Sequence, residues 1–213
     1  MSTLIATKDL SLYDLEKRFG VEVAIVPELL TPWLQTQAPP TEAEKAILHR
    51  IRQHYLNLNR RRPLLEDLVK MVVLSPLLAA TGFYDQDFEI KTEEKVEISI
   101  EDESTIIRGF MDILIIQEQL WLLVIETKRV QINVTTAIPQ LLFYLLTNSK
   151  SHPTYGLATN GLEFTFLKLT TQNNHPHCQR SYALSLERDE DINQVFTALK
   201  HFGQGMEIRS MDR

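Results

Sequence analysis

The sequence predicts a mixed α/β fold in which helices flank a central mixed β-sheet. Apolar residues recur at helical spacing before residue 85, alternate with polar residues after Phe88, and return to helical spacing between two later groups of strands. This order of helices, three strands, helix, two strands and helix differs from a Rossmann-type alternation. The 213 residues, 44% of them hydrophobic, suffice to bury the core of one domain with appended elements.

Three helices are predicted in the first 85 residues, each from an apolar stripe and a boundary residue. Gly20 suits the carboxyl end of the first helix, and Thr41 with Glu44 forms a capping box at the start of the second. Pro63 suits the first turn of the third helix, which Pro76 bends or restarts. We expect these helices at residues 12–19, 41–60 and 63–82, with a proline-rich connector at 27–40.

Five strands and two further helices are predicted after residue 85. The expected strands cover residues 88–100, 105–116, 120–128, 155–159 and 162–169, and the expected helices cover 134–148 and 191–201. The strand that begins at Leu120 is apolar on both faces and is therefore expected at the centre of the sheet. Asn160 and Gly161 predict a two-residue hairpin. We expect a polar loop at residues 170–180 and a frayed tail after Gly205.

The composition excludes several classes of protein. Cys178 is the sole cysteine, so no intrachain disulfide framework is available. His175 and His177 lie near it in the sequence, but a soft-metal site needs a second pair of ligands, and the sequence shows none, so we do not expect such a site. No stretch approaches the roughly 18 apolar residues of a membrane helix, and residues 1–10 lack the apolar segment of a secretory signal. We therefore expect a reduced, cytoplasmic protein with no membrane partner.

Charge is distributed unevenly along the chain. The formal net charge is −6, and residues 85–103 carry nine acidic side chains against two lysines, so the remainder is nearly neutral. Residues 45–62 carry six Lys and Arg side chains and no acid. Such a basic run is typical either of a solvated helix face or of a surface that contacts phosphates. The sequence leaves both interpretations open.

Charged residues at the end of the central strand are the strongest candidates for chemistry. Glu126 and Lys128 project to the same face because side chains alternate along a strand, while Thr127 points away. Asp112 lies on the preceding antiparallel strand and comes beside Glu126 if the register permits. Two carboxylates suit hydrated Mg²⁺, and a neighbouring lysine can position a metal-polarised water. The alternative is an ordinary ion pair at a strand end, a pattern that chance alone also produces.

Two segments and a helical motif resemble a known family. Residues 108–115 (RGFMDILI) and 121–129 (WLLVIETKR) resemble the core hairpin of the PD-(D/E)XK nuclease superfamily. Gln140 and Tyr144 match the Gln-x-x-x-Tyr motif that follows this core in the nuclease domain of type I restriction enzyme motor subunits, and their spacing puts both on one helical face. The helix containing Glu66 resembles the acidic first helix of this family, and the hairpin at Asn160 resembles its later hairpin. The resemblance therefore covers about residues 63–169.

The resemblance implies a role for each matching residue. Asp112 and Glu126 would bind Mg²⁺, for which Mn²⁺ can substitute, and Lys128 would contact the reactive phosphate or water. The family also implies a water-mediated metal contact for Glu66, and roles for Gln140 and Tyr144 in aligning the strand or the active-site residues. Met111 departs from the proline of the nominal motif, and no phosphate-binding loop of a translocating ATPase occurs in the sequence.

These features together predict a domain plan and a function. The resemblance implies a restriction-endonuclease-like core at residues 63–186, between a helical extension at 1–62 and a terminal helix and tail at 187–213. The expected function is metal-dependent, restriction-type hydrolysis of DNA phosphodiester bonds, with RNA left open as a substrate. A homodimer would cut both strands, and a specificity or modification subunit would be a further partner. The alternative is a catalytically inactive nuclease fold that binds nucleic acid or protein.

Overall fold

The computed structural model describes residues 3–85, 88–100, 105–117, 120–148, 153–173 and 175–204. The strands are β1 (Thr3–Ala6), β2 (Glu22–Ile25), β3 (Phe88–Ile100), β4 (Thr105–Gln117), β5 (Leu120–Thr127), β6 (Thr154–Thr159), β7 (Glu163–Gln172), β8 (His175–Arg180) and β9 (Leu184–Ser185). The helices are α1 (Leu12–Phe19), α2 (Thr31–Gln35), α3 (Glu42–Asn59), α4 (Glu66–Val69), α5 (Ser75–Ala80), α6 (Ile138–Asn148) and α7 (Asp189–Gly203). Short 3₁₀ turns form η1 (Thr7–Asp9) and η4 (Val134–Ala137), and a π-helical turn, η2 (Lys70–Leu74), joins α4 to α5.

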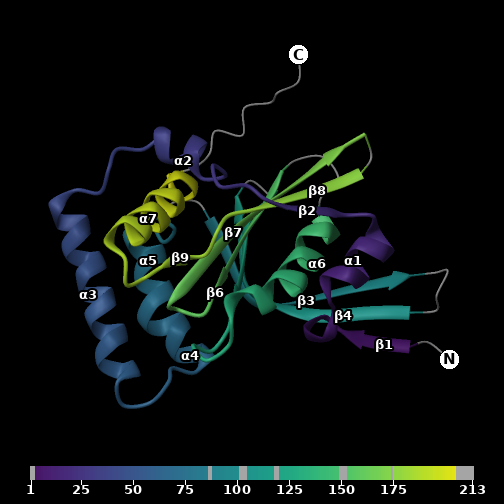
Figure 1. The fold of residues 1–213 in the computed structure, drawn as a ribbon, viewed down its shortest axis with the longest axis horizontal. Helices are drawn as coiled ribbons and strands as arrows, with labels where there is room; N and C mark the ends of the chain where they lie inside the picture. Colours follow the sequence, from purple (N-terminus) through teal and green to yellow (C-terminus); the bar gives the residue numbers. More distant parts are fainter. Residues whose placement is uncertain are drawn as a thin grey trace.

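The molecule has three layers, with one mixed sheet between two groups of helices. Helices α2, α3, α4, α5 and α7 gather on one face, and α1 and α6 cover the other (Figure 1). Alternate side chains of β4 and β5 therefore enter two separate cores: Ile113 and Leu123 face the first group of helices, whereas Leu114 and Val124 face α6. The predicted mixed α/β fold with a central sheet is confirmed.

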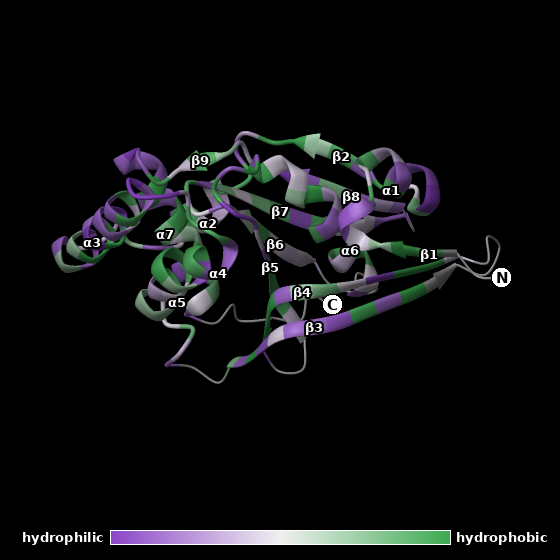
Figure 2. Ribbon diagram, turned by 90° about the horizontal axis from the view of Figure 1, so that it is seen from below, coloured by the Kyte–Doolittle hydropathy of each residue, from purple (hydrophilic) through white to green (hydrophobic). Residues whose placement is uncertain are grey.

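Strand β4 has different partners along its two edges. Strand β3 pairs antiparallel with β4 along one edge, from Thr105 to Met111 and again from Ile113 to Gln117. On the other edge, β1 pairs parallel with residues 105–108, and β5 pairs antiparallel with residues 113–117. Figure 2 shows β1, β4 and β3 side by side. Residues 109–112 therefore lie at a fork where neither β1 nor β5 continues the ladder, and this fork positions the candidate site.

Most of the predicted elements are confirmed. Gly20 adopts the left-handed conformation that ends α1, with φ of +62°. Thr41 and Glu44 form a complete capping box at the start of α3. The hairpin of β6 and β7 turns at Asn160 and Gly161, and β5 lies between β4 and β6. The local signals therefore identified both the boundaries of these helices and the centre of the sheet.

Several local expectations differ from the structure. The polar loop expected at residues 170–180 is wrong, because β7 extends to Gln172 and β8 pairs with it. Strands β1 and β2 lie within the first 62 residues, so the expected helical extension also adds two strands to the sheet. Helix α4 begins after Leu65, whose extended backbone (ψ 163°) keeps Pro63 outside the helix. The proline-rich connector contains the short helix α2.

Parts of four predicted segments lie outside the described residues. They are residues 86–87 and 101–104 of the acidic segment, residues 118–119 between the second and third expected strands, residue 174 of the expected polar loop, and the tail from residue 205. Within the described chain, no helix is both long and apolar enough to cross a membrane.

Candidate active site

Asp112 and Glu126 come together where β4 and β5 separate. The ladder between these strands ends at the pair of Ile113 and Ile125. Asp112 is the residue of β4 next to this pair. Its carboxylate takes the place of a backbone carbonyl of β4 as the acceptor, because Oδ2 accepts hydrogen bonds from both the backbone N–H and the hydroxyl of Thr127. Both acids are buried, with Asp112 8% and Glu126 2% exposed. The register therefore places the two predicted carboxylates side by side.

Glu126 occupies an environment that disfavours its charged form. Its Oε1 accepts a hydrogen bond from Lys128 Nζ at 2.5 Å, but its buried Oε2 has no hydrogen-bond partner among the described residues. Burial, followed by the negative charge of Asp112, raises the pKa of Glu126 to about 8 despite the nearby Lys128. A buried carboxylate with one unpartnered oxygen needs a proton or a further cation.

Gln140 and Tyr144 connect Lys128 to the fork in β4. Both residues lie on α6, four positions apart, and so share one face of the helix. Lys128 Nζ donates to Gln140 Oε1 at 3.1 Å, and Gln140 Nε2 donates to the Tyr144 hydroxyl at 2.9 Å. That hydroxyl in turn donates to the backbone oxygen of Phe110 at 2.8 Å. The predicted Gln-x-x-x-Tyr pair thus fixes which end of the Gln140 amide faces the lysine.

Glu66 and Lys70 approach the carboxylates from α4 and η2. Burial and the charge of Asp112 raise the pKa of Glu66, so the two acids are electrostatically coupled. Lys70 Nζ donates to Asp112 Oδ1 at 2.7 Å and lies 3.5 Å from Glu93. Burial lowers the pKa of Lys70, but the hydrogen bond to Asp112 and the negative charges of Asp112, Glu66 and Glu93 together outweigh it, and the net shift is upward. Sequence reasoning missed Lys70, although its position one turn after Glu66 was an available signal.

A cleft of about 560 Å³ gives access to these side chains. Glu66, Asp112, Glu126, Lys128 and Gln140 all contribute to its lining. The rest of the lining comes from the amino-terminal segment Leu4–Asp9, together with β4 at Arg108–Phe110. Sequence reasoning missed this part of the lining. The four-residue strand β1 carries too short a pattern to be recognised without its partner.

The donor set fits a divalent cation that keeps several of its own water molecules. Among the described residues, no group of three or more His, Cys, Asp and Glu side chains lies close enough together to hold a metal ion. Mg²⁺ typically needs just one or two protein carboxylates, with water and substrate phosphate completing its shell. The unpartnered Oε2 of Glu126, beside Asp112, is consistent with such a ligand pair. Glu66 lines the same cleft, and its water-mediated role stays a prediction.

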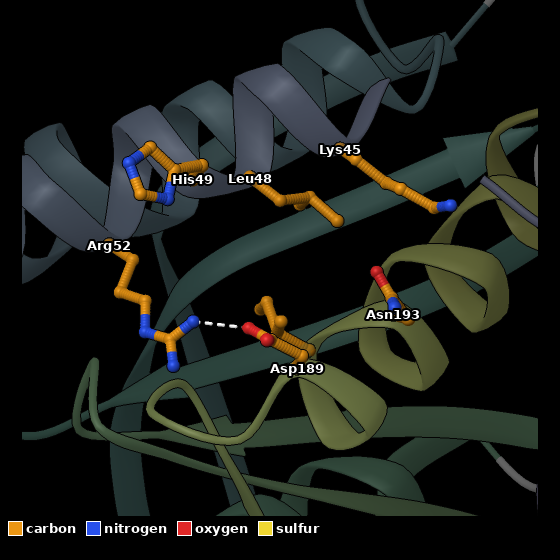
Figure 3. Close-up of a pocket in the computed structure, with 7 residues that line it drawn as sticks. Lys45, Leu48, His49, Arg52, Asp189 and Asn193 are labelled. Atoms are coloured by element: carbon orange, nitrogen blue, oxygen red, sulfur yellow. Dashed lines mark hydrogen bonds and ion pairs between the residues drawn. The ribbon is translucent and has the colours of Figure 1, made fainter. Parts of the chain in front are cut away.

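The basic run on α3 lies apart from the carboxylates. Lys45, His49 and Arg52 line a pocket of about 370 Å³ between α3 and α7. Figure 3 shows the Arg52 guanidinium directed at Asp189, with which it forms an ion pair, and Lys45 pairs with Glu42. Two of the six basic side chains are thus engaged within the protein. Phosphate binding by this run stays a prediction, carried by Arg60–Arg62, for which no ion pair occurs with the described part of the chain.

Cys178 has the properties of a core residue. Its side chain is 1% exposed and packs in the core beneath α6. Burial raises the pKa of its thiol to about 12, and His177 instead lies 3.3 Å from Glu22. His177 and Cys178 therefore both have contacts within the protein, and no metal-binding role is proposed for either residue.

Comparison with known proteins identifies one family. The family described as type I restriction enzyme R protein N terminus matches residues 22–175, more than two thirds of the chain. The match includes every predicted site residue from Glu66 to Tyr144, but it begins downstream of β1 and η1. No curated protein matches the chain.

Proposed function

The chain belongs to the family of type I restriction enzyme R protein N-terminal domains, and from this premise we propose that it is a Mg²⁺-dependent endonuclease that hydrolyses DNA phosphodiester bonds. The family indicates a nuclease-like domain of restriction type. The observation that supports activity is the convergence of Asp112, Glu126 and Lys128 in one cleft, with one carboxylate oxygen of Glu126 buried and unpartnered.

Each residue has a distinct part in the proposed reaction. Asp112 and Glu126 would hold the divalent ion, which, when bound, supplies positive charge at the phosphate and a polarised water. Thr127 orients Asp112 through its two hydrogen bonds. Lys128, held by Glu126 and Gln140, would contact the reactive phosphate or water. Tyr144 orients the Gln140 amide, and the cleft admits the substrate strand.

The experiment that tests this proposal is cleavage of supercoiled plasmid, single-stranded DNA and RNA with Mg²⁺ or Mn²⁺. Asp112→Asn and Lys128→Gln should abolish cleavage while preserving the fold. The exposed pair on α1 supplies matched controls, because Glu16→Gln and Lys17→Gln change the same charges outside the cleft. Equal activity of Asp112→Asn and the wild type would overturn the assignment. Cleavage of RNA alone would move the substrate from DNA to RNA.

A second candidate function is a catalytically inactive nuclease fold that binds nucleic acid or protein. The observation that favours it is internal charge compensation, because Lys70 bonds Asp112 and Lys128 bonds Glu126. A Mg²⁺ titration followed by thermal unfolding distinguishes the two functions. A ligand that binds the folded state raises its stability by mass action, so a working carboxylate site gains stability with Mg²⁺ whereas an inactive scaffold does not.

Partner subunits belong to the same proposal. A homodimer would place two clefts on the two strands of a duplex, and a specificity or modification subunit would direct cleavage to particular sequences. Light scattering after size-exclusion chromatography measures the mass of the species that carries the cleavage activity. Activity confined to a monomer, in the absence of any added subunit, would remove both parts of this proposal.

A further inference from the structure

The amino-terminal segment Thr3–Asp9 is built into the candidate active site, although it precedes the part of the chain that matches the family. Strand β1 pairs with β4 from Thr3 to Ala6, with Ala6 opposite Arg108. The chain then turns into η1, and residues 4–9 form one wall of the cleft that contains Asp112 and Lys128. Figure 1 shows β1 beside β4, across from α6.

Thr7 fixes this segment to the buried hydrogen-bond network of Tyr144. The two hydroxyl oxygens lie 3.1 Å apart. Tyr144 has one hydroxyl proton and donates it to Phe110, so Thr7 must be the donor to Tyr144. Tyr144 is fully buried, whereas the neighbours of Thr7, Ala6 and Lys8, are half-buried and exposed. The rigid partner is therefore α6, and the bond holds the amino-terminal segment in place.

Gly109 permits this close approach. A Cβ atom at that position would lie 2.1 Å from Thr7 Oγ1 and 2.6 Å from the Tyr144 hydroxyl oxygen. Real Cβ atoms do not come so near to other heavy atoms, so any side chain would separate Thr7 from Tyr144. The resemblance to the nuclease core included Gly109 but gave no reason for a glycine there. The geometry supplies that reason.

Lys8 is the cation that this arrangement leaves available. Among the described residues, three cationic side chains line the cleft: Lys8, Arg108 and Lys128. Arg108 pairs with Glu97 at 2.7 Å, and Lys128 pairs with Glu126. Lys8 is exposed, and within the described parts of the chain no carboxylate pairs with it. A free ammonium on the wall of a cleft suits the phosphate backbone of a bound strand.

We propose that Lys8 binds a backbone phosphate of the substrate strand in the cleft, and that Thr7 is the positioning residue that holds it there through Tyr144. This inference rests on the proposed DNA substrate. It adds to the site a binding residue that lies outside the family match, and it explains why a threonine, a glycine and a tyrosine from three separate elements meet beside the reactive carboxylates.

The test measures binding separately from cleavage. The full chain binds a short fluorescein-labelled duplex or single strand in Ca²⁺, and anisotropy gives the Kd at KCl concentrations from about 50 to 200 mM. Lys8→Gln should raise the Kd about fivefold and make the slope of log K against log salt shallower by about 1, as expected for the loss of one phosphate contact. Lys17→Gln, an exposed lysine on α1 outside the cleft, is the matched control and should match the wild type.

The role of Thr7 is tested by coupling to Lys8. Thr7→Val removes the hydroxyl at nearly constant volume and should raise the Kd by a similar factor, whereas Thr7→Ser should restore the wild-type Kd. In the double variant, Lys8→Gln should add little to Thr7→Val, because both changes remove the same contact. A merely structural role for Thr7 would lower the melting temperature and leave the two effects on Kd additive.

The outcomes separate this inference from the proposed function. Cleavage by the wild type with an unchanged Kd and salt slope in Lys8→Gln would overturn the role of Lys8 and leave the nuclease proposal standing. A slope that depends on Lys8 without any cleavage would support the phosphate contact and overturn the nuclease proposal. Additive effects of the Thr7 and Lys8 variants would overturn the positioning role alone. Absence of both DNA binding and cleavage would overturn both proposals.

Discussion

Thr127 donates two hydrogen bonds to a single oxygen of Asp112, one from its backbone N–H and one from its hydroxyl, each at 2.6 Å from Oδ2. The alternation of side chains places Thr127 away from Glu126 and Lys128, but the separation of β4 from β5 brings the Asp112 carboxylate across to it. Oδ2 is thereby committed to Thr127. The other oxygen, Oδ1, accepts a hydrogen bond from Lys70, and Asp112 lines the cleft, so Thr127 determines which carboxylate oxygen a ligand would share with Lys70.

We therefore expect Thr127→Val to weaken binding of a divalent ion. Valine keeps the volume of this fully buried side chain but removes one of the two bonds that orient Asp112. Loss of a partner that orients a metal ligand typically costs about tenfold in affinity. Isothermal titration calorimetry with Mn²⁺ measures the change. Thr170→Val, on β7 and outside the cleft, is the matched control, and an unchanged affinity in Thr127→Val would contradict the orienting role.

Burial of Glu126 makes the stability of the metal-free protein depend on pH. Because its pKa rises from 4.5 to about 8 on folding, the folded state retains a proton that the unfolded chain releases between those values. Stability therefore falls as the pH rises through this window, by at most about 1.4 kcal/mol per pH unit. Glu126→Gln removes the titrating group, so its stability should fall less steeply than that of the wild type.

Urea unfolding in EDTA between about pH 5 and 8 measures this difference. The gap between Glu126→Gln and the wild type should widen in favour of the variant as the pH rises. Glu16→Gln, an exposed acid on α1, should follow the wild-type curve. Parallel curves for Glu126→Gln and the wild type would show that Glu126 titrates alike in the folded and unfolded states.

Local signals in the sequence predicted much of the fold because they are physically self-contained. The capping box of Thr41 and Glu44 satisfies the first backbone donors of α3 within four residues. The turn at Asn160 and Gly161 is likewise closed locally, because the Thr159 and Asn160 side chains accept hydrogen bonds from the backbone N–H groups of Gly161 and Leu162. The sequence could also predict that the carboxylates of Asp112 and Glu126 lie close together, because a short connection restricts the register of two neighbouring strands.

Features that depend on distant partners could not be predicted in this way. Strand β1 is four residues long and forms by pairing with β4, about 100 residues later in the chain. Strand β8 has a mostly polar sequence because, of its six residues, only Cys178 is buried. This sequence therefore resembles that of a loop. The contact between Lys70 and Asp112 likewise joins a helical turn to a strand across the fold. Periodicity in a single segment holds no information about such pairings.

Two threonines on the hairpin of β6 and β7 should respond oppositely to replacement by valine. Thr165 is fully buried, and its hydroxyl has no hydrogen-bond partner among the described residues. Thr165→Val should therefore raise the free energy of unfolding by about 1 kcal/mol, because it removes an unsatisfied buried polar group. Thr159 donates to Glu163 and accepts from Gly161, so Thr159→Val should lower it by about 1 kcal/mol or more. Urea unfolding compares the two variants, and a loss of stability in Thr165→Val would mean that its hydroxyl has a partner.

Lys70 and a divalent ion should compete for Asp112. Lys70 Nζ lies 2.7 Å from Asp112 Oδ1, the oxygen that Thr127 leaves available. Lys70→Met keeps the length of the side chain and removes its charge, so Asp112 loses its cationic neighbour. In EDTA we expect the variant to be less stable than the wild type by roughly 1–3 kcal/mol, the usual cost of an uncompensated buried acceptor.

Addition of Mg²⁺ should stabilise Lys70→Met more than it stabilises the wild type. In Lys70→Met the metal ion replaces the lost positive charge and no longer has to displace an ammonium group. The rise in melting temperature with Mg²⁺ should therefore be larger in the variant than in the wild type. Lys91→Met on β3 is the matched control, since Lys91 pairs with Glu89 and does not line the cleft. A smaller Mg²⁺ response in Lys70→Met than in the wild type would show that Lys70 helps to hold the ion or its water. Equal and negligible responses in both would favour the inactive scaffold, in which Lys70 and Lys128 are the permanent cations of the site.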